Sequence, residues 1–444
     1  MFNRLKPKSE FSRNVLTLMT GTTIAQAIPI AISPILTRIY TPEDFGVFAL
    51  YMSMASIVSV MATGRYELAI MLPKKDEDAI NIVALSIMIS FLVSFITLLI
   101  VFFFNVSLTT FLGNPEISDW LYFIPLTVLL TGFYQSFNYW SNRKKEYKRL
   151  ATSRVIQSGT TATSNLAFGF AGLGSGGLIG SSILGQGVAG FVLGKMVVDK
   201  ESYLFPKIKK LKIYALARRY IKFPTWNLFS SFISTLRENL LIFAFSKYFE
   251  ASSLGFYFFA RRLLLLPSSI LISAFSDVFY QKISNIRSYT EIYEVAYRYF
   301  QKLFYLLTLP FIVFVFLLDV IIPTIFGEKW AMLSIYLLIM AFPIYFNLLV
   351  GHFSKILLRT NNQDVSFYFH GVKLVMLFLV LLITIGMGLS FLQVLVSVSI
   401  FEIFFILLGV VLIQSILKVK SANVLLFLLS MVLIGIEIII YNKI

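Results

Sequence analysis

Long apolar runs recur along the whole chain, and this repetition limits the folds that it can adopt more than any other feature. Runs of about 18 or more apolar residues are long enough for a helix to cross the ~30 Å hydrocarbon core of a bilayer. Charged residues make up 14% of the 444 residues, against about 25% in soluble domains. An all-α polytopic membrane protein is therefore predicted. We predict thirteen spans, at residues 12–37, 46–72, 80–104, 119–140, 152–172, 177–197, 223–246, 254–276, 299–322, 331–352, 367–388, 391–414 and 421–441.

The basic residues gather on one side of the predicted membrane. If the N-terminus is inside, most Lys and Arg residues fall in inner connections, and the outer connections and C-terminal tail hold Arg38, Lys247, Lys329 and Lys443. This bias follows the positive-inside rule and predicts a cytoplasmic N-terminus. The net charge of +16 thus indicates orientation and contact with anionic membrane lipids, and nucleic-acid binding is not expected. MFNRLKPKSEFSRN leads into a full-length span, so we expect the first helix to be retained rather than cleaved.

The two halves of the chain resemble each other. IYTPEDFGVFAL (39–50) aligns with YFEASSLGFYFF (248–259), which pairs Gly46 with Gly255, and TTFLG aligns with PTIFG in a later connection. Six spans separate the repeats, so both begin inside. This predicts two six-helix bundles related by a pseudo-two-fold axis along the membrane normal, with twelve to fourteen membrane helices in all. The expected divisions are an N-terminal lobe 1–206, a C-terminal lobe 207–420 and an extra helix within 421–444.

Two connections have patterns of their own. KIKKLKIYALARRYIKF (207–223) predicts an amphipathic interfacial helix that links the lobes. In the first outer connection, Thr41 precedes Pro42, Glu43 and Asp44, which is typical of turn-and-cap chemistry at the start of a helix.

Signatures of enzymes and of metal or cofactor sites are nearly absent. The chain has no cysteine, and its two histidines, His352 and His370, are too few for a metal cluster. GLGSGG (172–177) fits GxGxxG, but it joins two membrane spans without a preceding strand, so close helix packing is the better interpretation. The outer connections are too short to hold a catalytic domain. We therefore expect a protein that is not an enzyme and that uses no cofactor or metal.

Charged residues at membrane depth are the main candidates for a functional site. An ionised side chain in lipid costs about 3 kcal/mol or more, so such groups usually face a watery cavity and pair with one another. Arg65 and Glu67 are expected within the second helix, about two turns from its inner end. Arg237 and Glu238 lie near the middle of the seventh span, and Arg261 and Arg262 lie about two turns into the eighth. Further charges at membrane depth are Lys373, Glu402 in the twelfth span and Glu437 in the last.

Two interpretations of these charges stay open. Arg65 with Glu67, and Arg237 with Glu238, would form ion pairs in the first. In the second, the excess of arginine in the seventh and eighth spans suits an anionic substrate, because arginine binds phosphate in a bidentate manner. Glu67 and Glu238 are also candidates for coupling to a proton or sodium ion.

Three stretches resemble a known family: GTTIAQAIPIAISPILTRIYTPEDFG (21–46), RYELAIMLPKKDEDAINI (65–82) and FPTWNLFSSFISTLRENLLIFAFSKYFEASSLGFYFFARRLLLLPSSI (223–270). The chain resembles the Wzx-type polysaccharide flippases of the multidrug/oligosaccharidyl-lipid/polysaccharide exporter superfamily. The resemblance implies two bundles around a central cavity that opens alternately to each side. It also implies an undecaprenyl-diphosphate-linked oligosaccharide as substrate, moved from the inner to the outer leaflet of the bacterial inner membrane for O-antigen or another surface polysaccharide.

The resemblance also bears on the site and the partners. In relatives, cationic cavity residues are thought to engage the diphosphate, and the positions here are Arg38, Arg65, Arg237, Arg261 and Arg262. For Arg38, at the outer rim, anchoring at the interface is an equal alternative. The implied partners are the lipid-linked oligosaccharide, membrane lipids and the polymerase and chain-length machinery. Thirteen spans exceed the family's usual twelve, so 421–441 is either an additional peripheral helix or one predicted span does not cross.

The alternative function is a cation-coupled drug or small-molecule exporter of the same superfamily. Such a protein favours acids in its cavity, whereas the first span here contains none. A membrane enzyme would need a larger outer segment, and a structural scaffold would not explain arginines at membrane depth.

Overall fold

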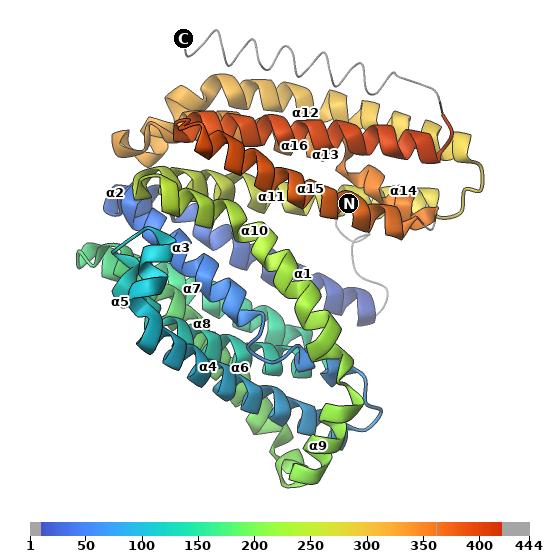
Figure 1. Cartoon of the computed structure of the whole chain (residues 1–444). Coiled ribbons are helices and arrows are strands. Elements are labelled where there is room, and N and C mark those ends of the chain that lie inside the picture. Colours follow the sequence, from blue (N-terminus) through green and yellow to red (C-terminus); the bar gives the residue numbers. More distant parts are fainter. Residues whose placement is uncertain (1–9, 361, 420–444) are drawn as a thin grey trace, which may run out of the picture. The chain divides into compact units, whose positions relative to one another are not determined.

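The computed structural model describes residues 10–360 and 362–419, and the regular secondary structure within them is entirely helical (Figure 1). The chain divides into two compact units, a first unit of Met1–Gly255 and a second unit of Phe256–Ile444. The all-α membrane fold is therefore confirmed. The predicted division into lobes 1–206 and 207–420 stays a prediction.

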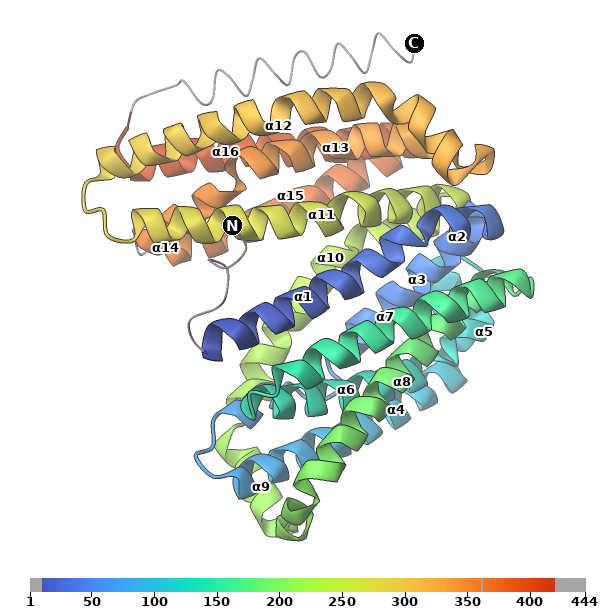
Figure 2. The same ribbon diagram turned by 180° about the vertical axis from the view of Figure 1, so that it is seen from behind.

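The first unit is a bundle in which helices distant in sequence pack together. Its elements are α1 (Glu10–Ala31), α2 (Ser33–Ile39), α3 (Pro42–Ser59), the 3₁₀ turn η2 (Tyr66–Met71), α4 (Asp76–Leu112), α5 (Ile117–Leu121), α6 (Ile124–Arg143), α7 (Tyr147–Phe170), α8 (Gly174–Glu201), η3 (Ser202–Lys207), α9 (Lys210–Arg219), the π-helical turn η4 (Phe223–Asn227) and α10 (Leu228–Tyr248). Helix α7 packs against both α1 and α8 (Figure 2). Helix α6 packs against both α4 and α8, and α10 packs on α3.

The second unit is built around α13. Its elements are α11 (Ala251–Ile283), whose first turn belongs to the first unit, α12 (Tyr289–Phe326), η5 (Glu328–Trp330), α13 (Leu333–Val350), η6 (Gly351–Phe353), α14 (Ser354–Arg359), α15 (Gln363–Gly386) and α16 (Phe391–Ile416). Helix α13 packs against α12 and α16, and α15 packs against α16.

Ten helices in the described residues are long and apolar enough to cross a membrane, and each coincides with a predicted span. The predicted span 152–172 also forms a helix, α7, but its polar side chains keep it out of those ten. These side chains bond to neighbouring helices: Arg154 donates to Thr22 Oγ1 at 2.6 Å, and Ser158 donates to the Ala25 carbonyl at 2.6 Å. The predicted span 421–441 lies outside the described residues.

The second predicted span, 46–72, differs from expectation. Helix α3 ends at Ser59, and the chain resumes as a 3₁₀ turn at Tyr66. Between them, Gly64 and Arg65 take left-handed conformations, with φ of 58° and 63°. Two consecutive residues at positive φ cannot continue a right-handed helix, and only glycine adopts that region without strain. The expectation that Arg65 and Glu67 lie inside a continuous helix is therefore wrong, because they flank a break.

The start of α3 has the predicted cap. The Thr41 backbone N–H donates to Asp44 Oδ2 at 2.9 Å, and the Asp44 N–H donates to Thr41 Oγ1 at 3.3 Å. This is a capping box, with Pro42 at the first helical position. It determines the residue at which α3 begins.

The predicted amphipathic segment forms α9, which packs against α4. Lys212 Nζ lies 3.4 Å from a Glu77 oxygen and 3.5 Å from an Asp78 oxygen. Leu216 is buried, whereas Leu211 on the opposite side is 81% exposed. The buried residues that cluster with Leu216 come from η2, α4, α6 and α8. Helix α9 therefore packs on the same hydrophobic core as η2, the turn that follows the break at Arg65.

Candidate functional site

A polar site is built at the break between α3 and η2, within the first unit. Arg65 Nη1 lies 3.3 Å from Glu67 Oε1. Arg65 Nε donates to Asn227 Oδ1 at 3.4 Å. Asn227 ends the η4 turn that leads into α10. The site therefore joins two segments that are far apart in sequence.

Glu67 is the buried anion of this site. Its side chain is 1% exposed, whereas that of Arg65 is 23% exposed. The Thr63 hydroxyl donates to Glu67 Oε2. A buried carboxylate is costly unless it is paired and hydrogen-bonded, and here both oxygens have partners. The ion pair expected between Arg65 and Glu67 is present, and the Arg65 side chain still reaches the surface.

The other predicted charges of the first unit are placed differently. Arg237 and Glu238 lie midway along α10, beside Asn239, which donates to Ser56 Oγ of α3 at 3.2 Å. Arg237 is half-buried and Glu238 is exposed. Within the described residues they form no ion pair with each other, so pairing is realised at Arg65 only. Arg38 is exposed in the last turn of α2.

The second unit has its own charged cluster. Arg261 and Arg262 lie in α11, are half-buried, and form no ion pair within the described residues. Tyr257, one turn earlier in α11, is buried. Glu402 of α16 accepts a hydrogen bond from Lys373 Nζ of α15 at 2.6 Å. The second unit therefore holds the Lys373–Glu402 ion pair as well as the two arginines.

Several of these partners are absent from the predicted site. Thr63 and Asn227 are uncharged. Thr63 is only four residues before Glu67, whereas Asn227 reaches Arg65, 162 residues earlier, only through the fold. Lys373 and Glu402 interrupt apolar runs, which is the same signal that identified the arginines. Their spacing along the chain does not reveal that they pair.

The arrangement is suited to holding an anion rather than to making or breaking bonds. Guanidinium groups donate only, and they present several N–H groups in a fixed plane that matches phosphate oxygens. Arg65 is oriented by Glu67 and Asn227, as a binding arginine needs to be. In the described part of the chain, no cluster of three or more His, Asp or Glu residues could hold a metal ion.

Comparison with known proteins gives a family and a fold. A family model described as "Polysaccharide biosynthesis protein" matches residues 35–335. No curated protein matches the chain in sequence. Among solved structures, the lipid II flippase MurJ in an inward closed conformation has a TM-score of 0.67 at 15% identity, over 96% of this chain and 97% of that one.

Two transporters also share the fold. A mutant of the Vibrio cholerae MATE transporter VcmN has a TM-score of 0.56 at 14% identity, over 91% of this chain and 96% of that one. A MOP-superfamily transporter from Pyrococcus furiosus has a TM-score of 0.55 at 13% identity, over 91% and 96% of the two chains. At these identities the likeness shows the fold alone.

Proposed function

The chain belongs to the polysaccharide biosynthesis protein family, and on that premise we propose that it is a flippase for a lipid-linked oligosaccharide. The proposed substrate is an undecaprenyl-diphosphate-linked repeat unit, moved from the inner to the outer leaflet of the bacterial inner membrane by alternating access. The sugar would serve O-antigen or another surface polysaccharide, with polymerase and chain-length proteins as downstream partners. The proposed lobes are 1–206 and 207–420, with the N-terminus in the cytoplasm.

The observation that carries this proposal is the fixed, partly exposed Arg65. Its backbone is held at the break, and its side chain is oriented by Glu67 and by Asn227. A cation that is positioned before the substrate arrives loses less conformational entropy on binding. The side chain keeps 23% exposure, so it can donate to a diphosphate without breaking the pair with Glu67.

The remaining arginines extend this proposal. Arg237, Arg261 and Arg262 are half-buried and would replace part of the hydration that the diphosphate loses inside the protein. We propose Arg38 as a contact at the outer rim, where it is exposed. Glu67 and Glu238 are proposed as sites of ion coupling, with Glu67 able to release Arg65 when protonated.

The alternative, a cation-coupled drug exporter, has less support from the site. A cationic drug needs an acid whose charge is available. Glu67 is buried and already neutralised by Arg65 at 3.3 Å, with Thr63 bound to its second oxygen.

The test replaces Arg65 in cells that lack their own copy of the gene. We expect Arg65→Ala to lower polysaccharide export by about tenfold or more, because a charge-assisted hydrogen bond to phosphate contributes roughly 1.5–3 kcal/mol. Arg65→Lys should restore only part of the activity, since lysine lacks the planar fork. Export is measured as surface polymer, together with the lipid-linked oligosaccharide that accumulates in the membrane.

Arg298→Ala is the matched control. Arg298 is 73% exposed, and among the described residues its one ion pair is with Glu294, one turn away on the same helix, so its loss should leave export unchanged. Normal export by Arg65→Ala at normal protein level, or drug resistance without any effect on polysaccharide, would refute the proposal.

A further inference from the structure

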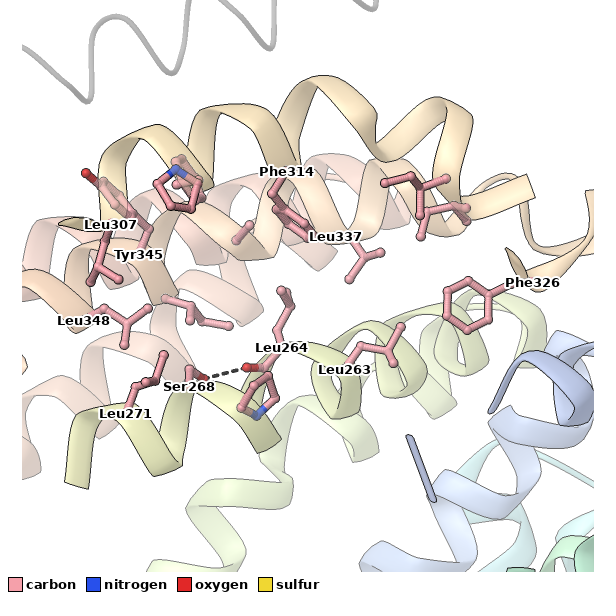
Figure 3. Close-up of a pocket in the computed structure, with 17 residues that line it drawn as sticks. Leu263, Leu264, Ser268, Leu271, Leu307, Phe314, Phe326, Leu337, Tyr345 and Leu348 are labelled. Carbon is pink, nitrogen blue, oxygen red and sulfur yellow. Dashed lines mark hydrogen bonds between the residues drawn. The ribbon is translucent and has the colours of Figure 1, made fainter. Parts of the chain in front are cut away.

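We propose that a partly open apolar cavity of the second unit, lined by α11, α12 and α13, binds the isoprenyl chain of the substrate. This inference rests on the proposed function and adds a site for the apolar part of the same molecule. The cavity has a volume of about 440 Å³. Figure 3 shows Leu263 and Phe326 at one end and Leu307, Leu348 and Leu271 at the other.

The cavity wall is suited to an apolar ligand. Its lining consists of Leu, Ile, Phe, Pro and Ala side chains except for Ser268 and Tyr345. The Ser268 hydroxyl donates to the Leu264 carbonyl at 2.5 Å (Figure 3). The Tyr345 hydroxyl lies 2.6 Å from Thr308 Oγ1. Both hydroxyls are therefore bonded within the protein, and hydrocarbon is the chemistry that fits.

Two prolines inside the helices contribute to the wall of this cavity. Pro267 of α11 and Pro310 of α12 both line it, and both are inside their helices. Proline removes a backbone hydrogen bond and clashes with the preceding turn, which bends or loosens a helix. An empty apolar space would forfeit dispersion contacts along its walls, so a membrane protein gains by filling it with lipid.

The volume fits several isoprene units. An apolar cavity of about 150 Å³ accommodates benzene, with six carbons, so a cavity about three times larger holds roughly three five-carbon units. An isoprenyl chain and a phospholipid acyl chain would both fit by volume. The two lipids differ in where their phosphate groups would lie relative to the arginines that precede the cavity-lining residues of α11.

Arg261 and Arg262 immediately precede Leu263 and Leu264, which line the cavity. Arg261 is ten residues after the first residue of α11, Ala251, and about two turns, or ~11 Å, into the predicted span 254–276, which places it below the surface of a ~30 Å hydrocarbon core. Phospholipid phosphates sit at the membrane surface. A lipid with its chain in this cavity and its phosphate at these arginines is therefore one in transit across the membrane, as a polyprenyl diphosphate would be.

The test uses photoreactive lipids on the purified full chain in nanodiscs. One probe is a polyprenyl diphosphate with a diazirine in its isoprenyl chain, and the other is a phosphatidylglycerol with a diazirine in its acyl chain. We expect the isoprenyl probe to label residues that line the cavity, and unlabelled undecaprenyl diphosphate to compete. Equal labelling by the acyl probe, or competition by phosphatidylglycerol, would overturn the proposal in favour of a general lipid site.

Leu264→Trp should fill the cavity and weaken isoprenyl labelling by about tenfold, because at least one isoprene unit loses its buried surface. Leu265→Trp is the matched control, since Leu265 is 40% exposed and does not line the cavity. Leu271→Trp, at the other end of the cavity, repeats the test if Leu264→Trp folds poorly. Unchanged labelling in a folded variant contradicts the site. Flipping of the reconstituted substrate is measured in parallel: flipping without cavity labelling refutes this inference alone, whereas absence of flipping refutes the proposed function.

Discussion

In the described part of the first unit, each buried charged side chain forms an ion pair with a side chain of opposite charge. Arg149 and Glu201 are 5% and 6% exposed and share two hydrogen bonds, of 3.1 and 2.8 Å. Glu67 is paired with Arg65 through a single contact of 3.3 Å. These pairs neutralise charge that lipid would otherwise penalise. Arg261 and Arg262 have no such pairs among the described residues, which is why we propose them as contacts for an anionic ligand.

The Arg149–Glu201 pair predicts a large effect on stability. Glu201→Ala should destabilise the protein by about 3 kcal/mol or more, because it leaves the Arg149 guanidinium buried and uncompensated. The melting temperature of the purified protein is the measurement. Glu146→Ala is the control: Glu146 also contacts Arg149, at 3.6 Å, but is 34% exposed, so its loss should cost less than about 1 kcal/mol. Equal effects of the two variants would show that burial of the pair is not what matters.

At the scale of elements, the starts of α3 and α11 cross closely within the first unit. A Cβ on Gly46 would lie 2.0 Å from the Ala251 carbonyl oxygen, and one on Gly255 would lie 1.7 Å from that of Pro42. The alignment that pairs Gly46 with Gly255 also pairs Pro42 with Ala251. The two contacts are therefore reciprocal, which is the relation that a two-fold axis produces. In each repeat, the glycine lies where the backbone of the other repeat comes closest: Gly46 at Ala251 and Gly255 at Pro42.

This crossing makes Gly46 intolerant of a side chain. Gly46→Ala should force the two helix starts apart, because real Cβ atoms do not approach a carbonyl oxygen within 2.0 Å. We expect less folded protein in the membrane and a lower melting temperature. Gly159→Ala is the control, since a Cβ there meets nothing within 4 Å, and alanine gains up to about 1 kcal/mol of helix propensity. Equal melting temperatures for both variants would contradict the close crossing.

At the scale of the whole molecule, the distribution of Lys and Arg predicts how the chain threads the membrane. The segment after α4 is expected outside, and the segment between α11 and α12 is expected inside. The chain contains no cysteine, so single cysteines report each position without interference. Glu116 and Arg287 are exposed residues in these two segments.

We expect a membrane-impermeant maleimide to label Glu116→Cys in intact spheroplasts. Arg287→Cys should react only after the membrane is permeabilised. Cysteine-free protein is the control for background labelling. The reverse pattern would place the N-terminus outside and reverse the proposed direction of transport.

Local patterns in the sequence determined much of this protein. Apolar runs of span length predicted the ten helices that can cross a membrane, because hydropathy depends on each segment alone. The Thr41–Asp44 cap was predictable because its bonds join residues three apart. The repeat was visible because related segments retain related sequence.

How the charged side chains pair depends on contacts between segments that are distant in sequence. Hydropathy continued the second span through Arg65, whereas the fold breaks it there and joins Arg65 to Asn227, 162 residues later. The Lys373–Glu402 pair and the cavity beside Pro267 and Pro310 likewise depend on how separate helices pack. Such contacts are set by three-dimensional packing rather than by spacing along the chain. The sequence therefore identified the arginines, and the fold determined that Arg65 is paired with Glu67.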